Sequence, residues 1–161
     1  MDFFRNIESY PKSFTASNII VRMIDGLGFR FYWTTHGLRK KDYEFSPAEG
    51  RWSISETVRH IRDLVNWISI SFEGKNWPKP ENDKKIREDT LKIMQQLRNL
   101  FENSSNEDLD NYRIRGMKVW NIINGPLADA LEHTGQIEML RRINGNPPEN
   151  FNYFLGKPPK E

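Results

Sequence analysis

The sequence predicts an all-α protein, a four-helix bundle, on three observations. Four stretches place apolar residues at the i, i+3, i+4 spacing of one helix face. We find no strand pairs between them that would build a sheet. The length of 161 residues suits one domain with its own core. We therefore expect a single domain over residues 1–161, with an irregular, proline-rich tail from about residue 145.

The first predicted helix covers residues 17–36. Ser17 or Thr15 would cap its start, and Gly37 suits its end. Its apolar face consists of Ile20, Met23, Ile24, Leu27 and Phe31. Gly26 and Gly28 lie inside this stretch, and we expect them to permit close packing of another helix.

The second predicted helix begins after Ser53 and ends at Gly74. Ser53 and Glu56 have the spacing of a capping box, in which each side chain bonds the other residue's backbone N–H. The apolar stripe comprises Ile54, Val58, Ile61, Leu64, Val65, Ile68 and Phe72. His60 lies at the edge of that stripe.

The third predicted helix spans residues 82–103, with a buried face of Ile86, Ile93, Met94, Leu97, Leu100 and Phe101. The fourth begins at Pro126, because proline suits the first turn of a helix. It ends near Ile143, before Asn144-Gly145. Residues 112–120 form either a short extended segment or an irregular crossover. We expect the tail after Pro147 to pack across the bundle.

The charge distribution argues against a nucleic-acid partner. The chain has 24 basic and 22 acidic residues, a formal net charge of +2. The basic clusters, at residues 39–41 and 84–85, are short and have acidic neighbours. A nucleic-acid-binding protein usually concentrates positive charge along one face. We therefore interpret these clusters as solvated surface.

The chain contains no cysteine, so disulfides, thiolate metal sites and cysteine nucleophiles are excluded. Any thiol chemistry would need a thiol supplied by a small molecule. No stretch approaches the ~18 apolar residues of a membrane span, and no membrane partner is expected. The first residues lack the apolar run of a signal peptide. These observations predict a cytoplasmic protein.

The most informative motif is the pair Asp129 and His133. The two residues are four apart on the fourth predicted helix, so their side chains lie on one face, one turn apart. His60, on the second helix, could supply a third ligand. Three protein ligands with one open position are typical of a catalytic Zn²⁺ or Ni²⁺ site. From spacing alone, a helix pair and a hydrogen-bonded histidine explain the same residues, and both interpretations stay open.

Other polar and aromatic residues have less specific interpretations. His36 would interact with the carboxyl end of the first helix. Gln136 would hydrogen-bond a ligand or, as we expect, a neighbouring helix. Glu132 and Glu138 would face solvent. The five tryptophans could line a pocket, but large aromatic side chains are more often found in the core.

Two stretches carry a family resemblance. Trp52-Ser-Ile-Ser-Glu56-Thr-Val-Arg-His60-Ile and Asp129-Ala-Leu-Glu-His133-Thr-Gly135-Gln136-Ile resemble the DinB/YfiT-like superfamily. In that family one histidine lies on the second helix, and two ligands spaced i and i+4 lie on a later helix before a Gly-Gln pair. The continuation Leu140-Arg-Arg-Ile-Asn-Gly145-Asn-Pro also fits. The resemblance covers most of the chain in helix order and length.

The resemblance implies a four-helix bundle, often a homodimer, with a divalent metal held by three side chains in a central cleft. Here His60, Asp129 and His133 match the ligand positions. Many members carry a third histidine where this chain has Asp129, whereas related mycothiol-dependent enzymes carry a carboxylate there, usually glutamate.

The resemblance further implies a thiol-dependent transferase or a hydrolase acting on a small-molecule substrate, with a low-molecular-weight thiol as a second cofactor. The alternative is a non-catalytic bundle that binds a small ligand or a partner protein. In that case the polar trio would serve as a hydrogen-bond network.

Overall fold

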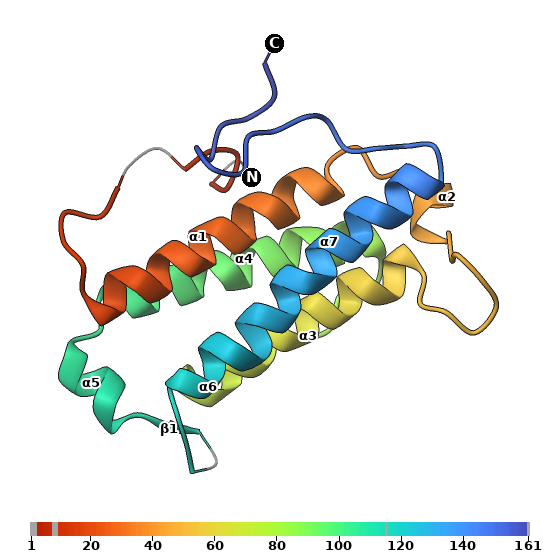
Figure 1. Cartoon of the computed structure of the whole chain (residues 1–161). Helices are drawn as coiled ribbons and strands as arrows, with labels where there is room; N and C mark the ends of the chain where they lie inside the picture. The colour runs from red at the N-terminus through yellow and green to blue at the C-terminus, as the bar shows by residue number, and fades with distance from the viewer. Residues whose placement is uncertain (1–2, 8–9, 115, 161) are drawn as a thin grey trace.

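The protein is mostly helical, and the all-α prediction is confirmed. The computed structural model describes residues 3–7, 10–114 and 116–160. The four long helices are α1 (Ala16–Thr35), α3 (Ile54–Glu73), α4 (Asp83–Glu102) and α7 (Ala128–Ile143). The short elements are α2 (Lys40–Tyr43), α5 (Asn106–Asn111), α6 (Trp120–Ile122), the π-helical turn η1 (Ile123–Leu127), β1 (Arg113–Ile114) and β2 (Met117–Lys118) (Figure 1). None of the helices in the described part of the chain is long and apolar enough to span a membrane.

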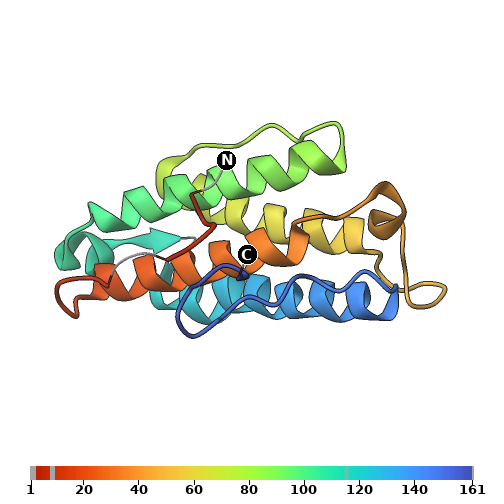
Figure 2. The ribbon, with the colours of Figure 1, turned by 90° about the horizontal axis from the view of Figure 1, so that it is seen from above.

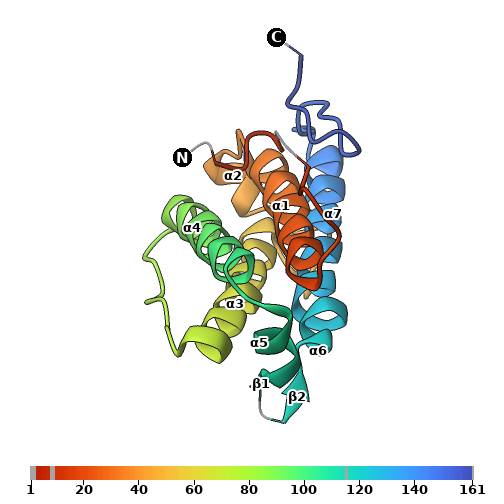
Figure 3. The ribbon, with the colours of Figure 1, turned by 90° about the vertical axis from the view of Figure 1, so that its left-hand side faces the viewer.

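The four long helices surround one apolar core. Helix α1 packs against α4 and α7, and α3 packs against the same two helices. Successive long helices α1 and α3 therefore lie diagonally across the bundle, as do α4 and α7 (Figure 3). The side chains at the centre are fully buried, among them Leu27, Phe31, Ile61, Met94 and Phe101.

Helices α3 and α4 run in the same direction. At their first turns the Ser55 hydroxyl donates to the Asp83 carboxylate over 2.6 Å, and near their last turns the rings of Phe72 and Phe101 touch. Parallel neighbours cannot be joined by a tight turn, so residues 74–82 travel back along the bundle (Figure 2). Helices α1 and α7 run in the opposite direction (Figure 2).

A buried arginine secures this long connection. Arg62, which is 3% exposed, donates hydrogen bonds to the carbonyl oxygens of Trp77 (2.6 Å) and Pro78 (3.0 Å) and to the carboxylate of Asp89 (3.0 Å). Asn66 accepts from the Trp77 backbone N–H over 2.9 Å. These bonds satisfy polar groups of a segment that has no secondary structure of its own.

The predicted helix starts are largely confirmed by cap geometry. Thr15 accepts a hydrogen bond from the Asn18 N–H and caps α1, while the alternative, Ser17, lies buried inside the helix. The Ser53–Glu56 capping box is present at the start of α3, and Gly74 ends α3 with φ +64°. Only a residue that tolerates positive φ fits there, which favours glycine.

The fourth helix begins differently from the prediction. The chain is already helical from Trp120, and α7 proper starts at Ala128 rather than at Pro126. Pro126 lies in the π-helical turn, directly after a kink at Gly125 (φ −102°, ψ −111°). Proline has no backbone N–H to donate. Regular helical geometry is already interrupted at Gly125, so the missing donor at Pro126 costs little there. The preceding segment contains the short β1–β2 pair, in agreement with an extended segment over 112–120.

The two chain ends pack on the bundle through aromatic contacts. In the tail, Phe151 is buried and its ring lies 5.5 Å from that of Phe29, so the predicted packing of the tail is confirmed. The expectation for Gly28 is wrong: a Cβ there would clash with the ring of Phe4, so this glycine makes room for the N-terminal segment and not for a helix. At Gly26, by contrast, a Cβ would meet no atom within 4 Å from any other described part of the chain, apart from the backbone of its own helix.

Asp42 links α2 to the carboxyl end of α7. Its fully buried carboxylate accepts hydrogen bonds from the backbone N–H and guanidinium of Arg39 and from the side-chain amides of Asn144 and Asn146, all between 2.8 and 2.9 Å. The Arg39 side-chain hydrogen bonds, together with that of Asn146, hold the pKa of Asp42 well below its usual range.

We predict that Asp42→Asn lowers the free energy of unfolding at pH 7 by about 2 kcal/mol, because neutral amide oxygens accept these bonds less strongly. A depressed pKa stabilises the fold above the unfolded-state value of about 4, and that contribution is lost as the pH falls below it. Urea unfolding should therefore show the difference between wild type and variant shrinking below about pH 4. Glu44→Gln, the same charge change at an exposed site, is the control; an equal effect would contradict the assignment.

Candidate metal centre

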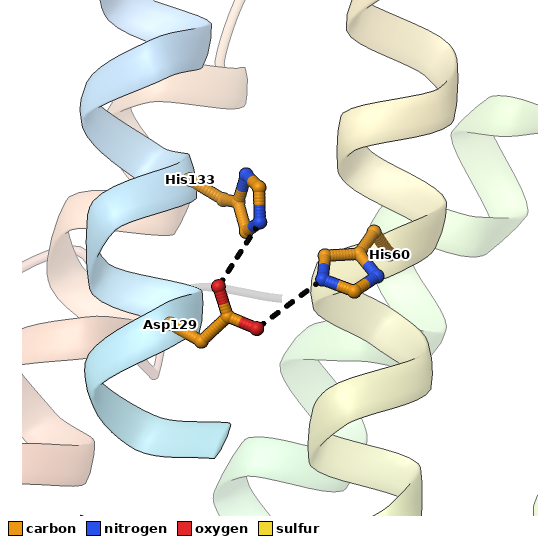
Figure 4. Close-up of side chains that lie close together, drawn as sticks. All are labelled: His60, Asp129 and His133. Atoms are coloured by element: carbon orange, nitrogen blue, oxygen red, sulfur yellow. Dashed lines mark hydrogen bonds and ion pairs between the residues drawn. The ribbon is translucent and has the colours of Figure 1, made fainter. Parts of the chain in front are cut away.

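The packing of α3 against α7 brings the three predicted ligands together. His60 projects from α3 toward Asp129 and His133 on α7 (Figure 4). One ligand atom from each residue lies within 4.8 Å of the others. Asp129 is central: its Oδ2 lies 3.3 Å from His60 Nε2, and its Oδ1 lies 3.1 Å from His133 Nε2.

These distances suit a shared cation. Zinc binds nitrogen and oxygen at ~2.0–2.1 Å, so two ligand atoms of a tetrahedral site lie about 3.3 Å apart. Each oxygen of the carboxylate has this separation from one imidazole nitrogen. A set of one ligand atom from each residue spreads over as much as 4.8 Å, so the side chains would have to draw together around a cation.

Local sequence sets the position of each ligand. The four-residue spacing of Asp129 and His133 puts both on the α7 face that meets α3. The capping box at Ser53 fixes where α3 begins and hence which face carries His60. Exposure rises from His133 (12% of its side chain) through His60 (32%) to Asp129 (42%), so the cluster opens to solvent beside the carboxylate.

Gln136 orients His133. The Gln136 Oε1 lies 2.8 Å from His133 Nδ1, one turn along the same helix. A carbonyl oxygen only accepts, so Nδ1 is the donor of this bond and Nε2 is the ring atom that faces Asp129. Nε2 and the carboxylate lie 3.1 Å apart, a separation that a shared cation would fit. The expectation that Gln136 bonds a neighbouring helix is wrong.

Trp52 belongs to the site, although sequence analysis did not separate it from the other tryptophans. Its ring stacks on His133 with centroids 5.7 Å apart and lies 5.0 Å from His60. The residue is 49% exposed. One sequence feature could have identified Trp52: it stands directly before the Ser53 capping box, about two helical turns ahead of His60. Trp33 is buried, and Trp67 and Trp77 pack against the core, as expected for large aromatic residues.

The remaining candidates lie outside the cluster. His36 follows α1, stacks on Tyr32 and lies 3.5 Å from Glu149. Glu132 is exposed, as expected, and does not belong to the cluster of His60, Asp129 and His133. Glu138 is not simply solvent-facing, because its carboxylate accepts from Arg142 over 2.7 Å and from the Tyr153 hydroxyl over 2.5 Å.

Comparisons of the chain with models of protein families, with curated proteins and with solved structures found no match. The geometry of the site itself therefore carries the functional argument.

We predict that Ni²⁺ quenches the fluorescence of Trp52. An open-shell ion such as Ni²⁺ quenches the excited state of a nearby indole, whereas closed-shell Zn²⁺ does not. In a titration, wild-type protein should lose emission with Ni²⁺ and keep it with Zn²⁺. Trp52→Phe should abolish the saturable loss.

Trp120→Phe is the matched control for that titration, because Trp120 is also exposed and makes no ring contact with His60 or His133 within the described chain. Equal quenching in both variants would show that Ni²⁺ binds elsewhere.

Proposed function

We propose that the protein is a divalent-metal-dependent enzyme of the DinB/YfiT-like type, in which His60, Asp129 and His133 hold Zn²⁺ or Ni²⁺. The observation that carries the proposal is the carboxylate of Asp129, placed 3.3 and 3.1 Å from two imidazole nitrogens. Oxygen and imidazole nitrogen form the donor set these ions accept. The sequence resemblance to that superfamily, at the same three residues, supports the proposal.

When bound, the metal would act as a Lewis acid and lower the pKa of a coordinated water or thiol. The side chains define where that chemistry takes place. Asp129 offsets part of the positive charge, and Gln136 keeps the Nε2 atom of His133 directed at the site. Trp52 covers the two imidazoles and limits access of water from its side.

We infer a small-molecule substrate from the same features. The cluster opens beside Asp129, where a small molecule can approach. The chain has no thiol of its own, so a thiol-dependent transfer would take its nucleophile from a low-molecular-weight thiol, and hydrolysis would take it from water. Transferase and hydrolase activity, assembly as a homodimer and a cytoplasmic location all stay predictions.

The alternative function is a non-catalytic binding bundle. The two Asp129–imidazole distances also fit ion pairs between the carboxylate and protonated histidines, which would make the trio a polar link between α3 and α7. Metal content separates the two functions, because only the first needs a cation other than the proton.

We predict about one Zn or Ni per chain in protein purified without a metal-binding tag. His133→Ala and Asp129→Ala should each lose it, since two ligands do not hold the ion. His36→Ala should keep it, because His36 lies outside the cluster. Elemental analysis measures this directly. Metal-free wild type whose melting temperature does not respond to Zn²⁺ or Ni²⁺ would favour the binding bundle.

We predict that Gln136→Leu weakens metal affinity by about 10–100-fold, because His133 loses the acceptor that fixes its orientation. Gln136→Glu keeps an acceptor at that place and should retain the affinity. Competition with a chelator of known affinity gives the values. If both variants bind the metal like wild type, Gln136 does not position His133.

A further inference from the structure

A cavity with several charged side chains on its walls lies at the end of the bundle where α1 finishes and α4 begins. Figure 2 shows these two helix ends at the same end of the molecule. The cavity has a volume of about 510 Å³, within the size range of small-molecule sites. Its walls come from the segment after α1, from α2 and from the first turns of α4, and include Thr35, His36, Lys40, Tyr43, Lys84 and Arg87. The candidate metal ligands come from α3 and α7 and do not line it.

The charge of this cavity is positive. Lys40, Lys84 and Arg87 bring three cations to its walls, against one lining carboxylate, Asp83. That carboxylate is already occupied, because Arg59 donates to it over 2.8 Å and Ser55 over 2.6 Å. The side chain of Lys40 is 93% exposed, and its nearest anion, Glu44, is 3.9 Å away.

Arg87 gives the cavity a fixed cation. Its guanidinium donates to the Thr35 hydroxyl over 2.8 Å and to the Tyr32 carbonyl oxygen over 3.1 Å, and it lies over the Tyr32 ring. These contacts tie α4 to the last turn of α1. A guanidinium has five N–H donors in one plane, so a charge held in this way favours recognition of a planar or tetrahedral oxyanion.

Tyr43 adds a hydroxyl donor to the wall of the cavity. The residue as a whole is 8% exposed and lines the cavity. No buried side-chain oxygen or nitrogen among the described residues lacks a hydrogen-bond partner, so the Tyr43 hydroxyl is not a buried, unsatisfied group and is open to the cavity. Burial raises the pKa of Tyr43, so the hydroxyl keeps its proton at neutral pH and can donate it to an anion.

We propose that this cavity binds the phosphate group of a small phosphorylated molecule. A phosphate carries about −1.5 to −2 charges at pH 7 and accepts several hydrogen bonds, which matches the Tyr43 hydroxyl beside the three cations. The first turn of α4 adds backbone N–H groups at the same place. The cavity is larger than one phosphate, so it accommodates the rest of the molecule as well.

The test is a titration of ¹⁵N-labelled full-length protein with inorganic phosphate at constant ionic strength, followed by amide chemical shifts. Saturable shifts are expected near Thr35–Leu38 and Asn82–Arg87. Lys84→Glu should weaken binding by at least about tenfold, because it reverses a charge at the anion. Tyr43→Phe removes one donor and should weaken binding about threefold to tenfold. Acetate at the same ionic strength should not produce these shifts.

Lys85→Glu is the matched control, since Lys85 is exposed on the same turn, pairs with Glu81 and does not line the cavity. It should bind phosphate like wild type. Equal losses in Lys84→Glu and Lys85→Glu, saturable shifts only around Asp129 and His133, or the absence of saturable shifts would each overturn the proposal. His133→Ala should bind phosphate with the affinity of wild type. The phosphate test therefore does not depend on whether His60, Asp129 and His133 bind a metal.

Discussion

The antiparallel packing of α3 against α7 is the contact on which the rest of the structure depends. It places position 60 opposite positions 129 and 133, and it does so only at one register. A shift of one helical turn moves a side chain by about 5.4 Å, more than the distance between any two of the ligand atoms. The site therefore requires the bundle to hold its helices against sliding.

Two buried arginines supply that restraint, Arg141 near the end of α7 and Arg62 in the middle of α3. Arg141 is 3% exposed and donates to the carbonyl oxygens of Thr34 and His36, both over 2.8 Å, which ties the end of α7 to the end of α1. Arg62 does the same for the connection between α3 and α4. Apolar packing tolerates small displacements, but a buried charge that loses its partners costs about 3–5 kcal/mol. The register of the bundle is thus set by directional hydrogen bonds of buried arginines as well as by its apolar core.

Much of the bundle could be predicted because its signals are local. The Ser53 capping box and Gly74 act within a few residues of a helix end, and they mark α3 to within one residue. The trio of His60, Asp129 and His133 was also within reach, because i and i+4 spacing fixes a shared helix face. The start of α7 was missed, since a helix that continues through a kink at Gly125 gives the same apolar pattern as one that begins there.

Other features depend on contacts between distant segments. Nothing local in the sequence shows that Arg62 is buried beneath the connection over 74–82, or that α3 and α4 are parallel. The role of Trp52 depends on α7 lying beside its ring, and the place of Tyr43 on the cavity wall depends on where α4 begins. Gln136 follows His133 by three residues, a spacing that is visible in the sequence. That its oxygen orients His133 can be seen only from the structure, where His133 Nε2 faces a carboxylate.

X-ray absorption spectroscopy of the protein loaded with Zn²⁺ or Ni²⁺ tests the central claim most directly, because it measures the ligands of the ion itself. For zinc, the predicted first shell contains only nitrogen and oxygen at ~2.0–2.1 Å, with the multiple-scattering signal of two imidazoles. His60→Ala, which leaves only two of the three ligands, should lose the bound ion and this signal with it. A spectrum without imidazole scattering, or one that His60→Ala leaves unchanged, would contradict a metal centre between α3 and α7.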